Sequence, residues 1–348
     1  MADTQSYQSK LKRLVFDSET TTGTAETPDA SSLVVPAFDI SLARDRGTGI
    51  IARDAVMDGL AGELCGVPGS FGSTLTFSTE IHPNASDVDP YFVRLLQACG
   101  FEGTDSGTAL TLFPSTKVIS NYAATTPNSL TFSLIALLEG IDDTIQTTFG
   151  ATGAASFVLN SGERAQIDCS FVGKNGDFMT FDADESAVGT VAELGCSPFV
   201  VKNVTATMVG SDTGAAFDEV QLSSITINTN AETPDILDPT EADGFAVSPV
   251  FFNSAPTVSF QIGATATNNT RFWSYFKDGE EISISITLDD PASTDSLQFL
   301  MERVQFTGVS MADNNGAESY SIEGKCVRDP GEGYNTTGSK FNIVWTYA

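Results

Sequence analysis

The sequence is poor in the side chains that most catalytic and metal sites need. His82 is the only histidine, so a single chain cannot form a His-rich metal site or a His–His acid/base pair. It precedes Pro83 with no Ser or Cys pattern nearby, so we expect a solvated turn residue rather than a general base. No GxSxG, Walker A or strand-linked GxGxxG motif occurs. We therefore expect no catalytic residues, no metal and no cofactor, and a protein that is not an enzyme.

Basic residues are also scarce. Lys and Arg number 17 against 45 Asp and Glu, which gives a formal net charge of −28 with His neutral. Clustered Lys and Arg are needed to grip nucleic-acid phosphates or an anionic membrane surface, so the balance argues against both roles. No stretch approaches 18 apolar residues, and residues 1–32 contain no signal-peptide core. We expect a protein that is made in a cytoplasm and does not enter a membrane.

Cysteine pairs with the spacing of redox or zinc motifs are missing too. Five cysteines are dispersed along the chain, and none forms a CxxC pair. An odd, scattered set favours reduced, buried thiols over a disulfide framework. The five residues are Cys65, Cys99, Cys169, Cys196 and Cys326.

What the sequence has in quantity is the pattern of β-strands. Apolar residues alternate with polar ones over Thr74–His82, Arg164–Phe171 and Glu281–Leu288, which is the period of a strand with one buried face. The turns Asn160-Ser161-Gly162 and Asn314-Asn315-Gly316 predict hairpins. Lys174–Asp177 (KNGD) also predicts a turn. The fold class is therefore mainly β.

Two short helices are expected between the strands. In DPYFVRLLQACGF, Asp89 fits the N-cap position and Gly100 ends the helix. In NNTRFWSYFKDG, Asn269 fits the cap and Gly279 ends the helix. The second helix is expected to turn three aromatic side chains inward, namely Phe272, Tyr275 and Phe276.

The order of these elements repeats along the chain. Each half reads as a strand, a loop of about 30 residues, a strand, a short capped helix and several antiparallel strands. We interpret this as two tandem β-sandwich or barrel domains, each with one helix and one long loop. The expected boundaries are a flexible N-terminal arm at 1–32, a first domain at 33–180, a linker at 181–195 and a second domain at 196–348.

Two groups of acidic residues deserve comparison with calcium sites. Their carboxylates are suitable ligands for Ca²⁺, but neither group has the D-x-[DN]-x-[DN]-G spacing of a calcium loop. Solvated loops explain them better. The groups are Asp182, Asp184 and Glu185, and Asp235, Asp238, Glu241 and Asp243.

The whole arrangement resembles a known family. The run from SLVVPAFDISLARDRGTGI through TLTFSTEI, PYFVRLLQACGF, SLTFSLIALLEG and GATGAASFVLNSGERAQIDCSFVGK resembles a phage tail tube protein. So do the later SSITINTNAETPDILDP, TVSFQIGA, ISISITL and VQFTGVSMADNNGAESYSIEGKC. The resemblance lies in architecture, over roughly residues 33–347, and its motifs are degenerate. The repeat resembles the form of this family in which two tube domains are fused.

The resemblance implies a structural virion protein. Such a major tail protein forms rings that stack into the conduit for phage DNA, which passes without specific binding. For a fused form, three chains would give a ring with pseudo-sixfold symmetry. The implied partners are further copies, a tail terminator, a tape measure and distal tail proteins, all in a virion tail made in the host cytoplasm. Alternatives are a capsid decoration protein, a tail terminator, or a binding or adhesin module.

The strand patterns give candidate residues for such a conduit. Polar side chains that alternate with Ile167, Cys169, Ile322 and Cys326 are expected to face the lumen or the outer solvent. These candidates are Gln166, Asp168, Ser170, Ser321 and Glu323. The two loops, Ala43–Ser73 and Asn228–Pro256, are too long for ordinary connections and are expected to carry the contacts between stacked rings.

Overall fold

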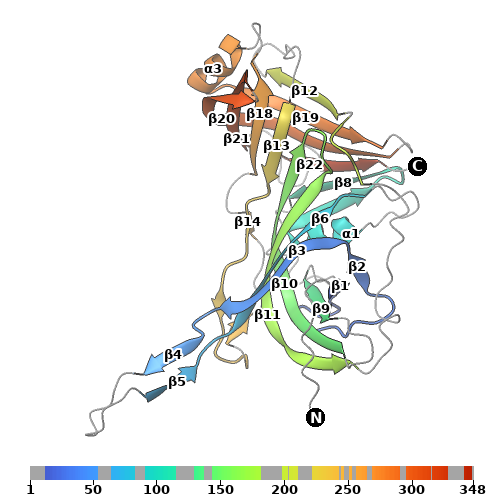
Figure 1. The fold of residues 1–348 in the computed structure, drawn as a ribbon, viewed down its shortest axis with the longest axis vertical. Coiled ribbons are helices and arrows are strands. Elements are labelled where there is room, and N and C mark those ends of the chain that lie inside the picture. Colours follow the sequence, from blue (N-terminus) through green and yellow to red (C-terminus); the bar gives the residue numbers. More distant parts are fainter. Residues whose placement is uncertain are drawn as a thin grey trace.

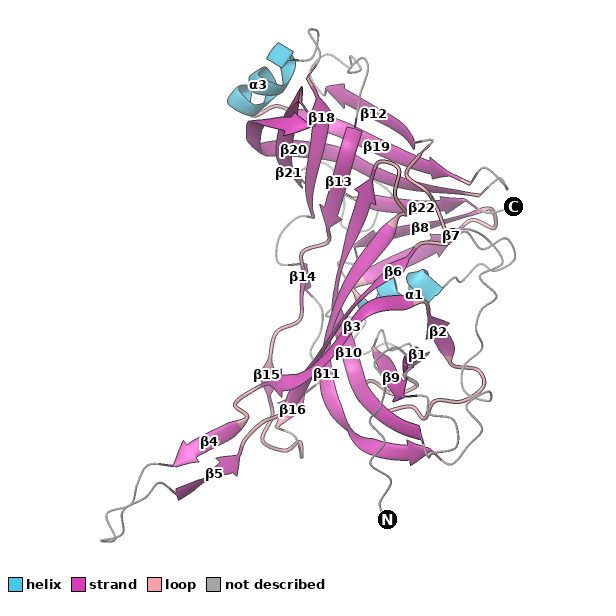
Figure 2. Cartoon of the chain, viewed as in Figure 1, coloured by secondary structure: helices cyan, strands magenta, loops and turns pink. Residues whose placement is uncertain are grey.

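The computed structural model describes most of the chain. The described residues are 12–53, 64–82, 91–114, 129–136, 143–181, 198–202, 204–210, 222–242, 244–246, 251–252, 256–264, 269–290, 295–314, 316–327 and 341–346. Asp89, Pro90, Cys196 and nearly all of the expected linker lie outside these ranges. In the described part, the fold is mainly β with two short helices, as the sequence predicts (Figures 1 and 2).

The elements of the first half run from β1 to β11. Their bounds are β1 (Lys12–Ser18), β2 (Leu33–Val35), β3 (Ala37–Arg46), β4 (Ile50–Arg53), β5 (Leu64–Pro68), β6 (Gly72–Glu80), α1 (Tyr91–Ala98), β7 (Phe101–Asp105), β8 (Ala109–Pro114), β9 (Leu130–Ala136), β10 (Asp143–Asn160) and β11 (Gln166–Phe181).

The elements of the second half run from β12 to β22. Their bounds are β12 (Val204–Gly210), β13 (Leu222–Asn228), β14 (Ala231–Glu232), β15 (Ile236–Leu237), β16 (Phe245–Ala246), β17 (Phe251–Phe252), β18 (Thr257–Gly263), α3 (Asn269–Asp278), β19 (Glu281–Asp289), β20 (Ser296–Asn314), β21 (Ala317–Cys326) and β22 (Asn342–Thr346).

The strand pairing repeats between the halves. In the first half, β10 pairs with β11 on one edge and with β9 on the other, β9 pairs with β1, and β11 continues to β6 and β3. In the second half, β20 pairs with β21 and β19, β19 pairs with β12, and β21 continues to β18 and β13. The two helices follow β6 and β18 at matching places. This repeat makes residue-by-residue comparison of the halves possible.

The halves are joined in one 16-stranded sheet. Ser156–Asn160 of β10 pairs with Ser224–Asn228 of β13, and β22 pairs with β8 of the first half. The sheet therefore runs across the expected boundary between domains.

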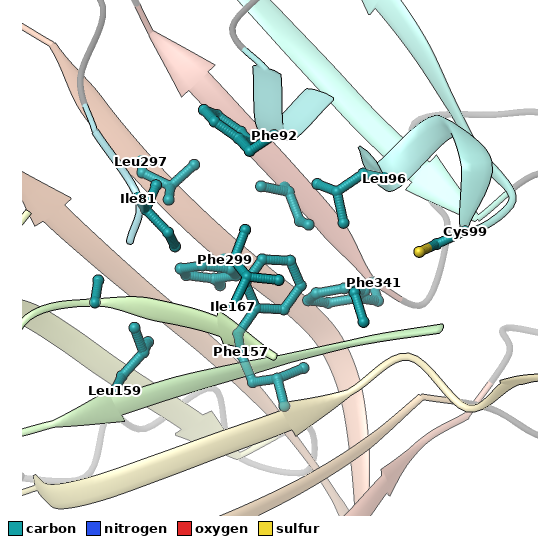
Figure 3. Packing of buried hydrophobic residues seen from close by; sticks show 14 of the residues in the cluster. Ile81, Phe92, Leu96, Cys99, Phe157, Leu159, Ile167, Leu297, Phe299 and Phe341 are labelled. Atoms are coloured by element: carbon teal, nitrogen blue, oxygen red, sulfur yellow. The ribbon is translucent and has the colours of Figure 1, made fainter. Parts of the chain in front are cut away.

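The core is shared as well. Phe157 of β10 lies against Phe299 of β20, with ring centroids 5.0 Å apart (Figure 3). The ring of Phe92 of α1 lies 5.3 Å from that of Trp345 of β22. All four side chains are at most 1% exposed. The division into two domains stays a prediction, and any unfolding of one half must disturb the other.

The N-terminal segment corrects the expectation of a flexible arm over residues 12–32. β1 pairs with β2 and β9, and its three apolar residues are buried on both faces of the sheet. Leu14 and Phe16 join the main core, while Val15 packs with Ile135 and Ile145 in a second cluster. A run of three apolar residues is thus a strand buried on both faces.

The expected turn at Lys174–Asp177 is also wrong, because β11 runs through it. A Cβ at Gly173 would lie 2.6 Å from the backbone oxygen of Phe149, next to an irregularity in the β10–β11 register. The glycine allows a close approach of two strands rather than a turn. By contrast, Gly162 and Gly316 have φ of +83° and +87° in the two hairpin turns that the sequence predicts.

Both helices end where the sequence predicts, at glycines with positive φ. α1 is almost wholly buried, but α3 buries only one side. Phe272 and Tyr275 face the core as expected, whereas Phe276 is 37% exposed, which corrects that part of the prediction. No helix among the described residues is long and apolar enough to cross a membrane.

Candidate functional site

The five sequence-predicted surface residues lie on one face of the joined sheet. Asp168 of β11 pairs with Ser156 of β10, Ser156 with Asn228 of β13, Asn228 with Thr257 of β18, and Thr257 with Lys325 of β21. Directly paired residues point to the same side of a sheet, as do residues two apart along a strand. Asp168, Gln166 and Ser170 therefore share a face with Glu323 and Ser321, although the two groups come from different halves.

The opposite face of the same strands is the core. Ile167, Cys169, Ile322 and Cys326 are at most 3% exposed, while Asp168, Ser170 and Glu323 are exposed and Gln166 and Ser321 are half-buried. The alternation that the sequence predicts is confirmed at these positions. Whether the polar face lines a conduit remains a prediction.

Small uncharged side chains dominate this polar face, which we define as the outward side of β6, β11, β10, β13, β18 and β21. The Oγ of Ser78 donates to Oδ1 of Asp168 at 2.6 Å, and Nε2 of Gln261 donates to Oγ of Ser319 at 2.9 Å. Other members, each bearing a hydroxyl or amide group, are Thr74, Thr76, Asn160, Ser224, Thr226 and Ser259.

Few charges interrupt this surface. Its acidic members include Asp168, Glu323 and Glu80, and Glu80 forms an ion pair with Arg164 at the end of β6. Lys325 is an exposed amine on the same face, which the sequence analysis did not single out. The polar face is thus mildly acidic and rich in hydroxyl groups, and it offers no cluster of cations to a polyanion.

The segment Ala43–Ser73 is not an irregular loop in its described part. It continues β3 to Arg46 and then forms the β4–β5 hairpin, which projects from the body (Figure 1). We call the described residues of this hairpin, 48–53 and 64–70, the arm. Its apolar side chains face solvent: Ile50 is 71% exposed, Ile51 51% and Val67 47%. Solvated apolar groups gathered on a projecting hairpin indicate a contact surface.

Reciprocal hydrogen bonds hold the base of the arm. The backbone N–H of Thr48 donates to Oγ of Ser70 at 3.1 Å, and the N–H of Ser70 donates to Oγ1 of Thr48 at 3.0 Å. Gly49 and Gly69 add backbone hydrogen bonds beside them. These bonds hold the two strands of the arm together where it leaves the body.

The second long segment, Asn228–Pro256, braces the same base. Arg46 forms an ion pair with Asp235, and Nζ of the buried Lys174 lies 2.7 Å from Oε2 of Glu241. The ring of Phe245 is so near Gly47 that a Cβ there would lie 2.7 Å from it.

The short β15 of this segment exposes two further apolar residues, Ile236 at 40% and Leu237 at 59%. Apolar surface from both long segments therefore gathers at the end of the molecule where the arm projects (Figure 2).

These contacts bear on the acidic groups as well. Asp235 and Glu241 pair with basic side chains, while Asp182, Asp184, Glu185 and Asp243 lie outside the described residues. Among the residues that the structure describes, no three His, Cys, Asp or Glu side chains come together as a metal site would require. His82 is 7% exposed, with Nε2 3.2 Å from Oε2 of Glu80, so it is a buried residue and not the solvated one expected.

The described cysteines are free thiols. Cys99, Cys169 and Cys326 are buried as expected, and burial raises the pKa of the Cys99 and Cys169 thiols well above the ordinary value. Cys65 on β5 is exposed, which corrects the expectation for that residue.

Comparison of the sequence with models of protein families and with curated protein sequences finds no match.

Proposed function

We propose that the chain is a major tail tube subunit of a bacteriophage, whose stacked rings form the conduit for DNA in the virion tail. The observation that supports this most is the polar face, which runs without interruption from the first half into the second. In the proposed ring this face lines the lumen. Two tube-like units per chain would give pseudo-sixfold symmetry in a ring of three chains.

The chemistry of the polar face suits a duplex that must slide. B-DNA carries about one negative charge per 1.7 Å of its axis, and clustered Lys and Arg would hold it in place. On the polar face, Lys325 is accompanied by Asp168 and Glu323, and most neighbours are neutral hydroxyls. A net charge of −28 per chain adds repulsion over the whole particle. DNA would therefore pass without specific binding.

The arm supplies the proposed contact between rings. A projecting hairpin with exposed Ile50, Ile51 and Val67 can bury these side chains against the next ring, and the brace from Asn228–Pro256 fixes its direction. Within the proposal, the tail terminator, tape measure and distal tail proteins bind the ends and the lumen of the tube. No enzymatic activity is proposed.

Electron microscopy of the purified protein tests this function. We expect rings or tubes, and we expect the double variant Ile50→Asp, Ile51→Asp to form rings that do not elongate, because two charges per arm would have to be buried. Val200→Asp is a matched control, since Val200 is 40% exposed but lies outside the arm.

Other outcomes would favour the alternatives. Normal-length tubes from the double variant would refute the role of the arm. Wild-type protein that binds only to capsids would support a decoration protein. Dispersed monomers at every concentration would support a binding or adhesin module.

A further inference from the structure

One strand edge that is paired along most of its length in the first half is, among the described residues, only partly paired in the second half. Along one edge of β10, residues 144–151 pair with β9 and residues 156–160 pair with β13. Along the matching edge of β20, residues 296–305 pair with β19, but in the described residues no strand continues over residues 307–314. The repeat therefore leaves one position vacant, next to the turn at Asn314.

In the described part of the chain, the strand that would match this position, β3, also has no paired strand on one edge. β13 is the strand that covers β10, and its equivalent in the first half is β3, because β3 pairs with β6 as β13 pairs with β18. Among the described strands β3 pairs with β6 alone, so its other edge is uncovered. Among the described strands, the polar face thus ends on each side at an edge with no paired strand, that of β3 and that of residues 307–314 of β20.

The exposure of matching side chains on β10 and β20 differs in the same way as the pairing of their edges. Phe157 and Met311 each lie three residues before the first Asn of a hairpin turn, on β10 and β20. Phe157 is 1% exposed because β13 and the second half cover it, with Ile227 directly opposite. Met311 is 63% exposed. A large apolar side chain at this place fits a strand edge that a partner covers.

The same comparison applies to the partner strand. Ile227 of β13, which pairs with Val258 of β18, is fully buried. Leu42 of β3, which pairs with Leu75 of β6 at the matching place, is only partly buried. Within the chain, Phe157 lies directly opposite Ile227. The matching pair between two chains would be Met311 of one copy opposite Leu42 of the other.

The helix beside β20 departs from the repeat in the same region. In α1, the positions six and three residues before the terminal Gly100 hold Arg94 and Gln97. In α3, the positions six and three residues before Gly279 hold Trp273, 41% exposed, and Phe276, 37% exposed.

The exposed aromatics of α3 lie close to the vacant edge. The Trp273 ring is 6.4 Å from that of Tyr320, which pairs directly with Met311. Polar positions of the first half are thus aromatic in the second, and they adjoin the uncovered part of β20.

We infer that residues 307–314 of β20, together with Met311, Trp273 and Phe276, bind the free edge of β3 in a second copy of this chain. The contact repeats between chains the β10–β13 pairing found within one chain, and it places Met311 against Leu42 of the second copy. Because β3 and β20 border the polar face, the polar faces of successive copies join. That the partner is a second copy of the chain rests on the proposed function, while the pairing of β20 with β3 rests on the repeated strand order of the two halves.

Cross-linking of two separately purified variants tests the pairing. One carries Met311→Cys and the other Leu42→Cys, both with Cys65→Ser and Cys196→Ser so that the remaining native thiols are the buried ones. Oppositely placed residues on antiparallel strands are close enough for a disulfide. Under mild oxidation we expect a covalent dimer in the mixture, at least tenfold above either variant alone and above a mixture of Met311→Cys with Val200→Cys.

A second variant covers the case in which Leu42→Cys does not fold. Met311→Asp changes a side chain that is 63% exposed, so the monomer should fold normally, as circular dichroism would show. We expect it to remain monomeric in sedimentation velocity at concentrations where the wild type forms rings. Val200→Asp, the matched control, should form rings.

The outcomes separate this inference from the proposed function. Rings or tubes without the specific disulfide, or with Met311→Asp unimpaired, would overturn the strand pairing and leave the tube function standing. A specific disulfide in closed dimers or trimers that never stack would support the pairing and count against a tail conduit. Monomeric wild type without a disulfide would overturn both.

Discussion

Phe157 joins the two halves of the core, and its removal tests whether they unfold together. The side chain is 1% exposed, packs edge-on against Phe299 at 5.0 Å, and lies opposite Ile227. Phe→Ala at such a site costs about 3–5 kcal/mol, including about 0.5–1.5 kcal/mol for the aromatic pair. The expected loss in the free energy of unfolding is therefore larger than that of an alanine substitution at a surface position.

Urea unfolding followed by the fluorescence of Trp345 measures this effect. Trp345 is buried on β22 in the second half, and replacing the only other tryptophan by Trp273→Phe isolates its signal. With an m-value of about 3 kcal/mol/M, Phe157→Ala should lower the midpoint by roughly 1 M or more. Val158→Ala, one residue away on the polar face, should shift it far less. If circular dichroism shows part of the sheet unfolding early while the Trp345 midpoint stays in place, the shared core is not cooperative.

Three further predictions concern charged groups. Glu19 is 2% exposed and accepts hydrogen bonds from Oγ of Ser129, Oγ1 of Thr131 and the N–H of Gly23. In a denaturant titration, Glu19→Ala should therefore lower the free energy of unfolding by about 3 kcal/mol, and Glu19→Gln by clearly less. Equal, negligible losses for both variants would contradict the role of these bonds. Burial raises the pKa of Asp17, so its ionised form destabilises the fold at pH values above the ordinary pKa of the carboxyl. Asp17→Asn should therefore give a small gain in thermal stability at pH 7, and this gain should disappear as the pH falls below the raised pKa. A gain that does not depend on pH would refute this. Asp168→Lys with Glu323→Lys should slow DNA ejection through assembled tails in low salt and less so at moderate salt, and unchanged ejection at both salts, with normal assembly, would show that these residues do not face DNA.

Alternating patterns made the faces of the strands predictable. The sides predicted for Gln166–Phe171, and for Ser321, Ile322, Glu323 and Cys326, are correct because the solvated and buried environments alternate along these strands. Hairpin glycines were equally informative, since Gly162 and Gly316 need a positive φ. The turn predicted at Lys174–Asp177 is wrong, because a glycine that lets two strands approach closely looks the same in sequence as one in a turn.

The joining of the halves could not be predicted from local patterns. β10 carries no signal that its last five residues pair with β13, more than 60 residues away, because a buried strand reads the same whichever strand covers it. The brace on the arm depends on Arg46 and Lys174 meeting Asp235 and Glu241, and long-range ion pairs have no sequence spacing. Met311 becomes informative only when its exposure is compared with that of Phe157.

The two long segments that occupy matching places in the two halves have different structures. In a ring of identical domains, the segments Ala43–Ser73 and Asn228–Pro256 would have to do the same thing. Here the first projects as the arm, while Asp235, Glu241 and Phe245 of the second hold its base. The same divergence appears in the helices, where α1 is enclosed and α3 exposes Trp273. In the proposed tube, the first half would therefore supply the arm that joins rings, while the second half would supply Met311 and α3 to the contact within a ring.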